Sequence, residues 1–153
     1  MVQIPFFKPS IGKEEIAAVN KVLRSGWVVQ GPKVKEFEKA FAEYIGAPFC
    51  VFVNSCSNAL FLAMQWLNYI GATKQDTKIG IPSLTFVATA EAVINAGLIP
   101  YFLDVNDDLL IHGNYQGIII PVHLAGVRSQ AKGSVVVEDS AHLIEKSGFS
   151  GNT

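Results

Sequence analysis

The chain has 153 residues, of which 50% are hydrophobic and 16% are charged, and its formal net charge at pH 7 is −1. A chain of this length forms about one domain, so we expect residues 1–153 to share a single core. The near-neutral charge argues against a nucleic-acid partner, because proteins that bind polyanions carry basic surfaces. No apolar run is long enough to cross a bilayer, and the first residues lack a secretory signal pattern. We therefore expect a cytoplasmic protein that binds neither nucleic acid nor membrane.

Two amphipathic helices are predicted in the first third of the chain. The apolar residues of 13–24 recur at helical spacing, and Gly26 ends the pattern. A turn-rich connector follows over 27–33. Pro32 suits the first position of a second helix, and Gly46 lies just past the end of its apolar pattern.

Five short β-branched or aromatic runs come next, and their residues are apolar at nearly every position. Such runs are typical of strands buried on both faces of a parallel sheet. The predicted strands cover residues 49–53, 78–81, 99–103, 117–121 and 134–138. Helix-like stretches over 57–70 and 86–96 separate the first three strands. This alternation predicts an α/β fold with a mostly parallel sheet, flanking helices and right-handed crossovers.

The connections between the last three predicted strands are short. Residues 106–116 and 122–133 supply 11 and 12 residues, near the lower limit of about 10 to 12 for a parallel crossover. Any helix within them must therefore be very short. The run 49–53 must pair with 134–138 or remain an unpaired edge, and such edges recruit partners. We therefore expect a homo-oligomer, or a chain completed by a second polypeptide.

Residues 54–58, Asn-Ser-Cys-Ser-Asn, lie between a predicted strand and a predicted helix. The first N–H groups of a helix have no intrahelical acceptor, and the helix dipole places partial positive charge there. Small residues let a phosphate approach these groups, and the hydroxyls of Ser55 and Ser57 add donors. Either serine is equally suited to be the N-cap of the helix. The two interpretations are compatible, and both stay open.

The order of the motifs resembles the N-terminal part of the DegT/DnrJ/StrS-type nucleotide-sugar aminotransferases. The matching segments are SGWVVQGPKVKEFEKAFAEYIG, VNSCSNAL, IPSLTFVATAEAVINAG, FLDVN, IPVHLAG and VVEDSAH. The resemblance implies a shortened large domain of the aspartate-aminotransferase-like fold (fold type I), without the C-terminal small domain. It also implies pyridoxal 5′-phosphate (PLP) as the cofactor. The implied function is the cofactor-binding part of an aminotransferase that acts on a keto-sugar nucleotide with an amino-acid donor.

Within this resemblance, Cys56, Ser57 and Asn58 match the motif that holds the cofactor phosphate. Cys56 stands where the family usually has glycine, which leaves open which N–H groups donate. Phe86 matches an aromatic residue that lies on the pyridine ring, where a flat apolar face excludes water. Without the resemblance, Phe86 would be assigned to the core, where most aromatic residues lie.

The resemblance places Asp139 against the pyridine nitrogen and His142 near the 3-oxygen of the ring. A carboxylate beside the nitrogen favours the protonated pyridinium, which is the electron sink of the cofactor. Asp139 follows an apolar strand, at the edge where parallel α/β sheets bind ligands; without the resemblance it is equally suited to be a helix N-cap. Trp27, Gln30 and Gly31 resemble a loop near the nucleotide sugar and the dimer interface, and are candidate substrate contacts.

No metal site is expected. Cys50 and Cys56 form no Cys-x-x-Cys pair, so we expect two reduced thiols. His123, Asp139 and His142 lack the spacing of zinc ligands, and His123 is given no catalytic role. A serine hydrolase is excluded, because the sequence has no Gly-x-Ser-x-Gly elbow. Glu138 is expected to be structural or solvated.

The resemblance further implies a lysine that holds PLP as a Schiff base and moves the substrate proton. In the family this lysine follows a later strand, which we expect to lie outside this chain. Neither Lys132 nor Lys146 stands in that context. Two hypotheses remain open. The chain is either the cofactor-binding part of an aminotransferase completed by another polypeptide or a second copy, or a catalytically silent module that binds PLP, a sugar nucleotide or another protein.

Overall fold

The computed structural model describes residues 8–145. Expectations that fall on residues 1–7 and 146–153, including that for Lys146, lie outside the described residues. Within 8–145 four of the strands form the main sheet, in the order β2-β1-β4-β6, with every neighbouring pair parallel. These strands are β1 (Lys78–Pro82), β2 (Ile99–Leu103), β4 (Ile118–Ile119) and β6 (Val135–Val136). The predicted parallel α/β fold is confirmed.

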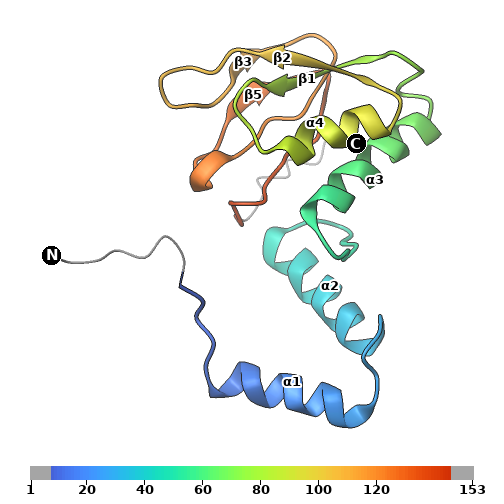
Figure 1. Cartoon of the computed structure of the whole chain (residues 1–153), viewed down its shortest axis with the longest axis vertical. Helices are drawn as coiled ribbons and strands as arrows, with labels where there is room; N and C mark the ends of the chain where they lie inside the picture. Colours follow the sequence, from blue (N-terminus) through green and yellow to red (C-terminus); the bar gives the residue numbers. More distant parts are fainter. Residues whose placement is uncertain (1–7, 146–153) are drawn as a thin grey trace, which may run out of the picture.

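Two helices cover one face of this sheet (Figure 1). They are α3 (Cys56–Tyr69) and α4 (Val87–Asn95), close to the predicted bounds. Met64 of α3 and Val93 of α4 are fully buried against Ile79 and Ile81 of β1. Burial accounts for the apolar sequence of β1 and β4, whose residues are covered on both faces of the sheet, whereas the edge strand β2 is mostly exposed.

The other face of the sheet carries a smaller apolar cluster. Leu103, Ile111 and Ile119 form it. A separate two-stranded parallel sheet, β3 (His112–Asn114) with β5 (Gln130–Lys132), lies beside the main one. Neither strand was expected from the sequence, since His-Gly-Asn and Gln-Ala-Lys contain no apolar run. The short 3₁₀ helix η1 (Leu124–Gly126) lies in the last connection, where only a very short helix was expected.

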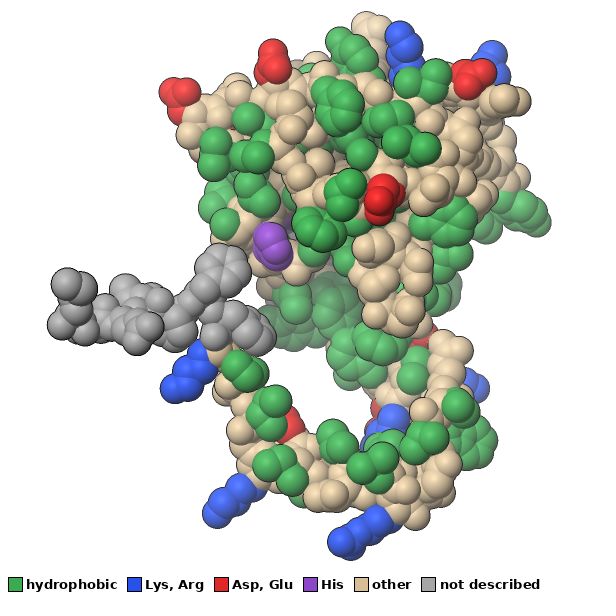
Figure 2. All heavy atoms as spheres, in the orientation of Figure 1, with side chains coloured by type: hydrophobic (Ala, Val, Ile, Leu, Met, Phe, Trp, Pro, Cys, Tyr) green, Lys and Arg blue, Asp and Glu red, His purple; other side chains and the backbone are tan. Residues whose placement is uncertain are grey.

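The two N-terminal helices form as predicted and differ from α3 and α4 in their surroundings. They are α1 (Lys13–Ser25) and α2 (Pro32–Ile45), and neither contains a buried residue. Each ends at a left-handed glycine, Gly26 with φ 72° and Gly46 with φ 78°, a conformation that glycine adopts at no steric cost. Figure 1 shows α1 and α2 extending away from the sheet, and Figure 2 shows apolar side chains along them. No helix described in residues 8–145 is long and apolar enough to cross a membrane.

The strand predicted over 49–53 is wrong. These residues form no strand, so they neither pair with 134–138 nor add an edge to the sheet. The segment contacts α2 instead. The ring of Phe52 meets that of Phe37 edge-on at 4.9 Å between centroids, and the Phe52 N–H donates to Glu38 Oε1 at 2.9 Å. An apolar run becomes a strand only where a neighbouring strand satisfies its backbone. Within the described residues β6 is the edge strand and pairs with β4 on one side, but 49–53 does not pair with its other side.

Candidate functional site

The amino end of α3 forms the first wall of the site. Ser55 is the N-cap, with its Oγ accepting a hydrogen bond from the Asn58 N–H at 3.2 Å. The capping interpretation is therefore correct for Ser55. Ser57 lies inside the helix, so it is not the cap. The side-chain amide nitrogen Nδ2 of Asn58 donates to Asn54 Oδ1 at 2.6 Å. This bond holds the Asn58 side chain against the turn before the helix.

A cavity of about 330 Å³ lies where four chain segments meet. Its walls are Cys56, Ser57, Leu60, Phe86, Ala88, Val122, His123, Leu124, Asp139, Ala141 and His142. Five of the six residues expected at the cofactor face this cavity, and Asn58 does not. The cavity thus brings the beginning of α3 and the end of the last strand together, although these segments are far apart in the sequence.

The backbone of Asp139 is fixed by the sheet. Its N–H donates to the carbonyl of Pro121 at 2.9 Å, and its carbonyl accepts from the His123 N–H at 3.0 Å. These bonds form an isolated parallel bridge between Val122 and Asp139 beyond β4 and β6. Residues 140–145 contain no helix, so the alternative role of Asp139 as a helix N-cap is wrong.

The carboxylate of Asp139 is buried, with 6% of the residue exposed, and has donors at both oxygens. Oδ2 accepts from the hydroxyl of Thr89 at 3.0 Å. Oδ1 accepts from the Ala141 N–H at 3.3 Å and lies 3.6 Å from Cys56 Sγ. Burial raises the pKa of the Cys56 thiol, and the charge and hydrogen bond of Asp139 raise this pKa further. Cys56 is therefore a thiol, not a thiolate, at neutral pH, and donates to the carboxylate.

Phe86 and His142 provide two more walls. Phe86 precedes α4 and is 74% exposed, so its assignment to the core is wrong and its ring is available to a ligand. The Nδ1 atom of His142 accepts a hydrogen bond from the Ala125 N–H at 3.2 Å. In the neutral ring the proton must then be on Nε2, which makes this atom a donor.

Thr85 and Thr89 belong to this site and were missed at the level of sequence. Thr89 lies in the first turn of α4, is fully buried and contacts Asp139. Thr85 Oγ1 lies 2.8 Å from Thr89 Oγ1. Thr85 precedes the N-cap residue Phe86, so helical spacing does not relate the two threonines. The signal in the sequence is that both are polar residues in a largely apolar segment.

The candidate substrate loop lies elsewhere. Trp27 and Gly31 line a separate cavity of about 440 Å³ at the connection between α1 and α2, and Gln30 does not line it. The indole Nε1 of Trp27 donates to the Gln30 carbonyl at 3.2 Å. A Cβ at position 31 would lie 2.0 Å from that Nε1 atom, so the indole requires glycine there. The structure does not bring these three residues to the cavity beside Asp139.

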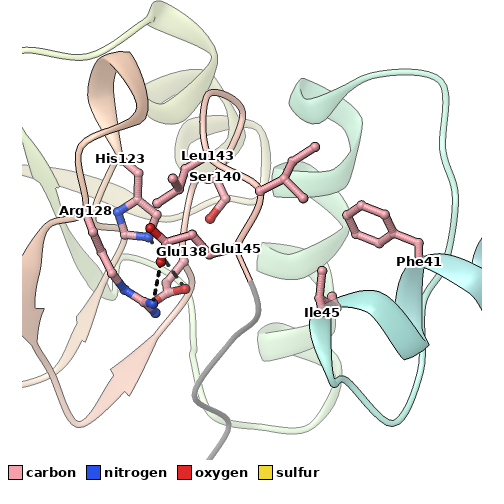
Figure 3. Close-up of a pocket in the computed structure, with 9 residues that line it drawn as sticks. Phe41, Ile45, His123, Arg128, Glu138, Ser140, Leu143 and Glu145 are labelled. Carbon is pink, nitrogen blue, oxygen red and sulfur yellow. Dashed lines mark hydrogen bonds and ion pairs between the residues drawn. The ribbon is translucent and has the colours of Figure 1, made fainter.

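Behind the site lies a third cavity of about 200 Å³, between α2 and the end of the sheet. Figure 3 shows His123, Arg128 and Glu138 gathered on one side of it, and Phe41 of α2 facing them. His123 is buried, with Nδ1 accepting from the Ser129 N–H at 3.2 Å and Nε2 lying 3.6 Å from Glu138 Oε2. Arg128 pairs with Glu138 at 3.3 Å. Within residues 8–145, no three His, Cys, Asp or Glu side chains lie close enough to hold a metal ion.

The fold and the site define a class. The parallel α/β fold matches solved structures of PLP-dependent, fold type I sugar aminotransferases. The sequence profile of the DegT/DnrJ/EryC1/StrS aminotransferase family matches residues 9–145. The chain belongs to this family.

Particular relatives support the assignment. The spore coat polysaccharide biosynthesis protein SpsC of Bacillus subtilis (strain 168) is 38% identical over an alignment 162 residues long, and the match covers 92% of this chain and 40% of SpsC. The PLP-form of the putative sugar aminotransferase Spr1654 from Streptococcus pneumoniae has a TM-score of 0.71 and 31% identity, over 83% of this chain and 34% of that one.

A third relative is the E. coli GDP-4-keto-6-deoxy-D-mannose-3-dehydratase with bound hydrated PLP. Its TM-score is 0.74 at 25% identity, and the match covers 82% of this chain and 35% of that one. The chain thus spans about two fifths of the curated relative SpsC, at 40%, and about a third of these solved structures, at 34% and 35%.

Proposed function

We propose that this chain is the cofactor-binding part of a PLP-dependent aminotransferase that acts on a keto-sugar nucleotide with an amino-acid donor. The observation that carries the proposal is the shared cavity, in which the amino end of α3, the exposed ring of Phe86 and the buried carboxylate of Asp139 face one space. The family supports the reaction class, and the relatives of known structure that hold PLP support the cofactor.

The residues around the cavity suit PLP in three respects. The cofactor needs a phosphate site, and Cys56 and Ser57 stand at a helix amino end, where N–H groups and the dipole favour an anion. It needs a flat apolar surface, and the ring of Phe86 supplies one. It needs a negative charge beside its ring nitrogen, and Asp139 is held by the sheet with both oxygens oriented by donors.

Each side chain then has a separate task. Asp139 keeps a proton on the ring nitrogen, because an adjacent carboxylate favours the cationic form. The Nε2–H of His142 is the donor available to the 3-oxygen of the ring, since Nδ1 is already occupied by the Ala125 N–H. Phe86 excludes water from one face of the ring. With these groups in place, PLP would supply an electron sink for a substrate carbanion.

The lysine needed for transamination is proposed to come from outside the described residues. No lysine of residues 8–145 lines the cavity. We propose that a segment outside residues 8–145, or a second polypeptide, supplies the lysine, and that the working protein is an oligomer in the cytoplasm. Trp27, Gln30 and Gly31 then remain candidates for contacts with the nucleotide sugar across such an interface. The alternative is a catalytically silent module that binds PLP without covalent attachment.

Binding of pyridoxamine 5′-phosphate tests the proposal, because this ligand has no aldehyde and cannot react with surface lysines. We expect saturable binding by calorimetry, weakened roughly tenfold or more in Asp139→Asn, since a hydrogen bond to a charged group contributes about 1.5–3 kcal/mol. Glu138→Gln is the matched control, because Glu138 adjoins Asp139 but does not line the cavity. Unchanged affinity in Asp139→Asn would reject the assignment of the site.

Borohydride reduction in the presence of PLP tests the origin of the lysine. We expect no stoichiometric labelling of any single lysine in the purified chain. Labelling of one lysine that excess pyridoxamine 5′-phosphate prevents would show that the chain contains the amine after all. Mass spectrometry of the digested protein identifies the labelled position.

A further inference from the structure

The carboxylate of Asp139 has two oxygens in different surroundings. Oδ2 accepts from Thr89, whose side chain is fully buried in the first turn of α4. Oδ1 is adjacent to Cys56, a residue that lines the cavity. One oxygen therefore points to the interior of the fold and the other to the space where a ligand would lie.

The direction of the hydrogen bonds follows from the donors available. A carboxylate only accepts, so the single proton of the Thr89 hydroxyl must be directed at Oδ2. Thr89 then has only lone pairs left for Thr85, 2.8 Å away. Thr85 must therefore be the donor of that pair. The two threonines form a chain of donors, from Thr85 to Thr89 to Asp139.

We propose that Thr89, supported by Thr85, is a positioning residue that fixes the Asp139 carboxylate so that Oδ1 is the oxygen presented to the ring nitrogen of the ligand. This inference rests on the proposed function. The backbone of Asp139 is already held by Pro121 and His123, so rotation of the side chain is the motion that remains. Thr89 opposes this rotation at Oδ2, and the Ala141 N–H opposes it at Oδ1. The second donor at Oδ1 is the thiol of Cys56, a weak donor that a pyridinium can displace.

The test compares two ligands that differ at one ring atom. They are pyridoxamine 5′-phosphate and its 1-deaza analogue, in which C–H replaces the ring nitrogen. We expect Thr89→Val to weaken binding of the first ligand roughly tenfold, the size expected when a charged group loses a hydrogen bond. Binding of the analogue should change less than twofold, because it presents no nitrogen to Asp139. Thr89→Ser retains the hydroxyl and should restore the affinity.

Thr85→Val should have a smaller effect than Thr89→Val, since Thr89 still donates to Asp139 without it. Circular dichroism and thermal unfolding check that each variant is folded. Thr89→Cys, which has similar size and a weak donor, replaces the valine variant if that variant does not fold. These variants separate a role in positioning from a role in folding.

The outcomes distinguish the inference from the proposed function. If Asp139→Asn weakens the binding of pyridoxamine 5′-phosphate but Thr89→Val does not, the positioning role of Thr89 is wrong and the proposed cofactor site is retained. If Thr89→Val lowers the affinity for both ligands equally, the positioning role is also wrong, because an effect that does not depend on the ring nitrogen indicates a merely structural role. Failure of Asp139→Asn to affect either ligand rejects the site itself.

Discussion

The N-terminal helices α1 and α2 and the sheet-packed helices α3 and α4 carry different apolar patterns and lie in different surroundings. Helices α1 and α2 are amphipathic, and the structure buries no residue of either. Helices α3 and α4 bury seven residues between them, and these pack on the sheet. Apolar spacing therefore predicts that a helix forms and where it ends, but its burial depends on whether a complementary surface lies within reach.

The largest expected difference between the two helix pairs is in stability. Met64→Ala removes a fully buried side chain from α3 and should lower the free energy of unfolding by about 2–5 kcal/mol. Val19→Ala on α1 changes a side chain that is 59% exposed and should cost less than about 0.5 kcal/mol. Urea unfolding followed by circular dichroism measures both. A large cost for Val19→Ala would mean that α1 is covered in solution, for example by a second copy.

The two cysteines give a smaller, local contrast. Burial raises the pKa of both thiols. The charge of Glu38 raises the pKa of Cys50 further, and the charge of Asp139 raises the pKa of Cys56 further. We expect Asp139→Asn to lower the pKa of Cys56 alone and to speed its alkylation by iodoacetamide below pH 9. Glu38→Gln should do the same at Cys50 alone. Peptide mass spectrometry follows each site, and a variant that altered both thiols would contradict this independence.

The smallest expected effects concern two exposed carboxyl groups, one in each half. The pKa of the Glu15 carboxyl is lowered by hydrogen bonds from the backbone N–H groups of Glu15 and Gly12. The pKa of the Asp108 carboxyl is lowered by a hydrogen bond from the side chain of His112. In each case the pKa is lower in the folded chain than in the unfolded chain. Each carboxylate therefore contributes to stability above its unfolded pKa, which is 4.5 for Glu15 and 3.8 for Asp108. This contribution is lost as the pH falls through the folded value.

Carbon-detected NMR titration measures both groups directly. His112→Gln should raise the pKa of Asp108 toward its ordinary value and leave Glu15 unchanged. Identical titration of Asp108 in the two proteins would show that the His112 contact does not persist in solution.

Sequence reasoning was reliable where one local pattern decides the outcome. The strand over 99–103 has the predicted bounds, and α3 is displaced by one residue at each end. It missed β3 and β5, whose pairing depends on backbone contacts between polar segments distant in sequence. It misassigned 49–53 because an apolar run does not reveal whether a neighbouring strand exists.

The site shows the same division. The helix start at Ser55 and the acid after a strand at Asp139 are features of local sequence. The contact of Thr89 with Asp139 arises only from how α4 packs on the sheet, so no spacing rule could supply it. The tautomer of His142 likewise depends on Ala125, seventeen residues away.

The contacts at Asp139 span 50 residues to Thr89 and 83 to Cys56. Long loops must close before such contacts form, so the cavity exists only once segments distant in sequence have come together. A small molecule that occupies the cavity therefore binds only the finished fold and shifts the folding equilibrium toward it. In a cell, the supply of that molecule would govern how much of the chain survives proteolysis.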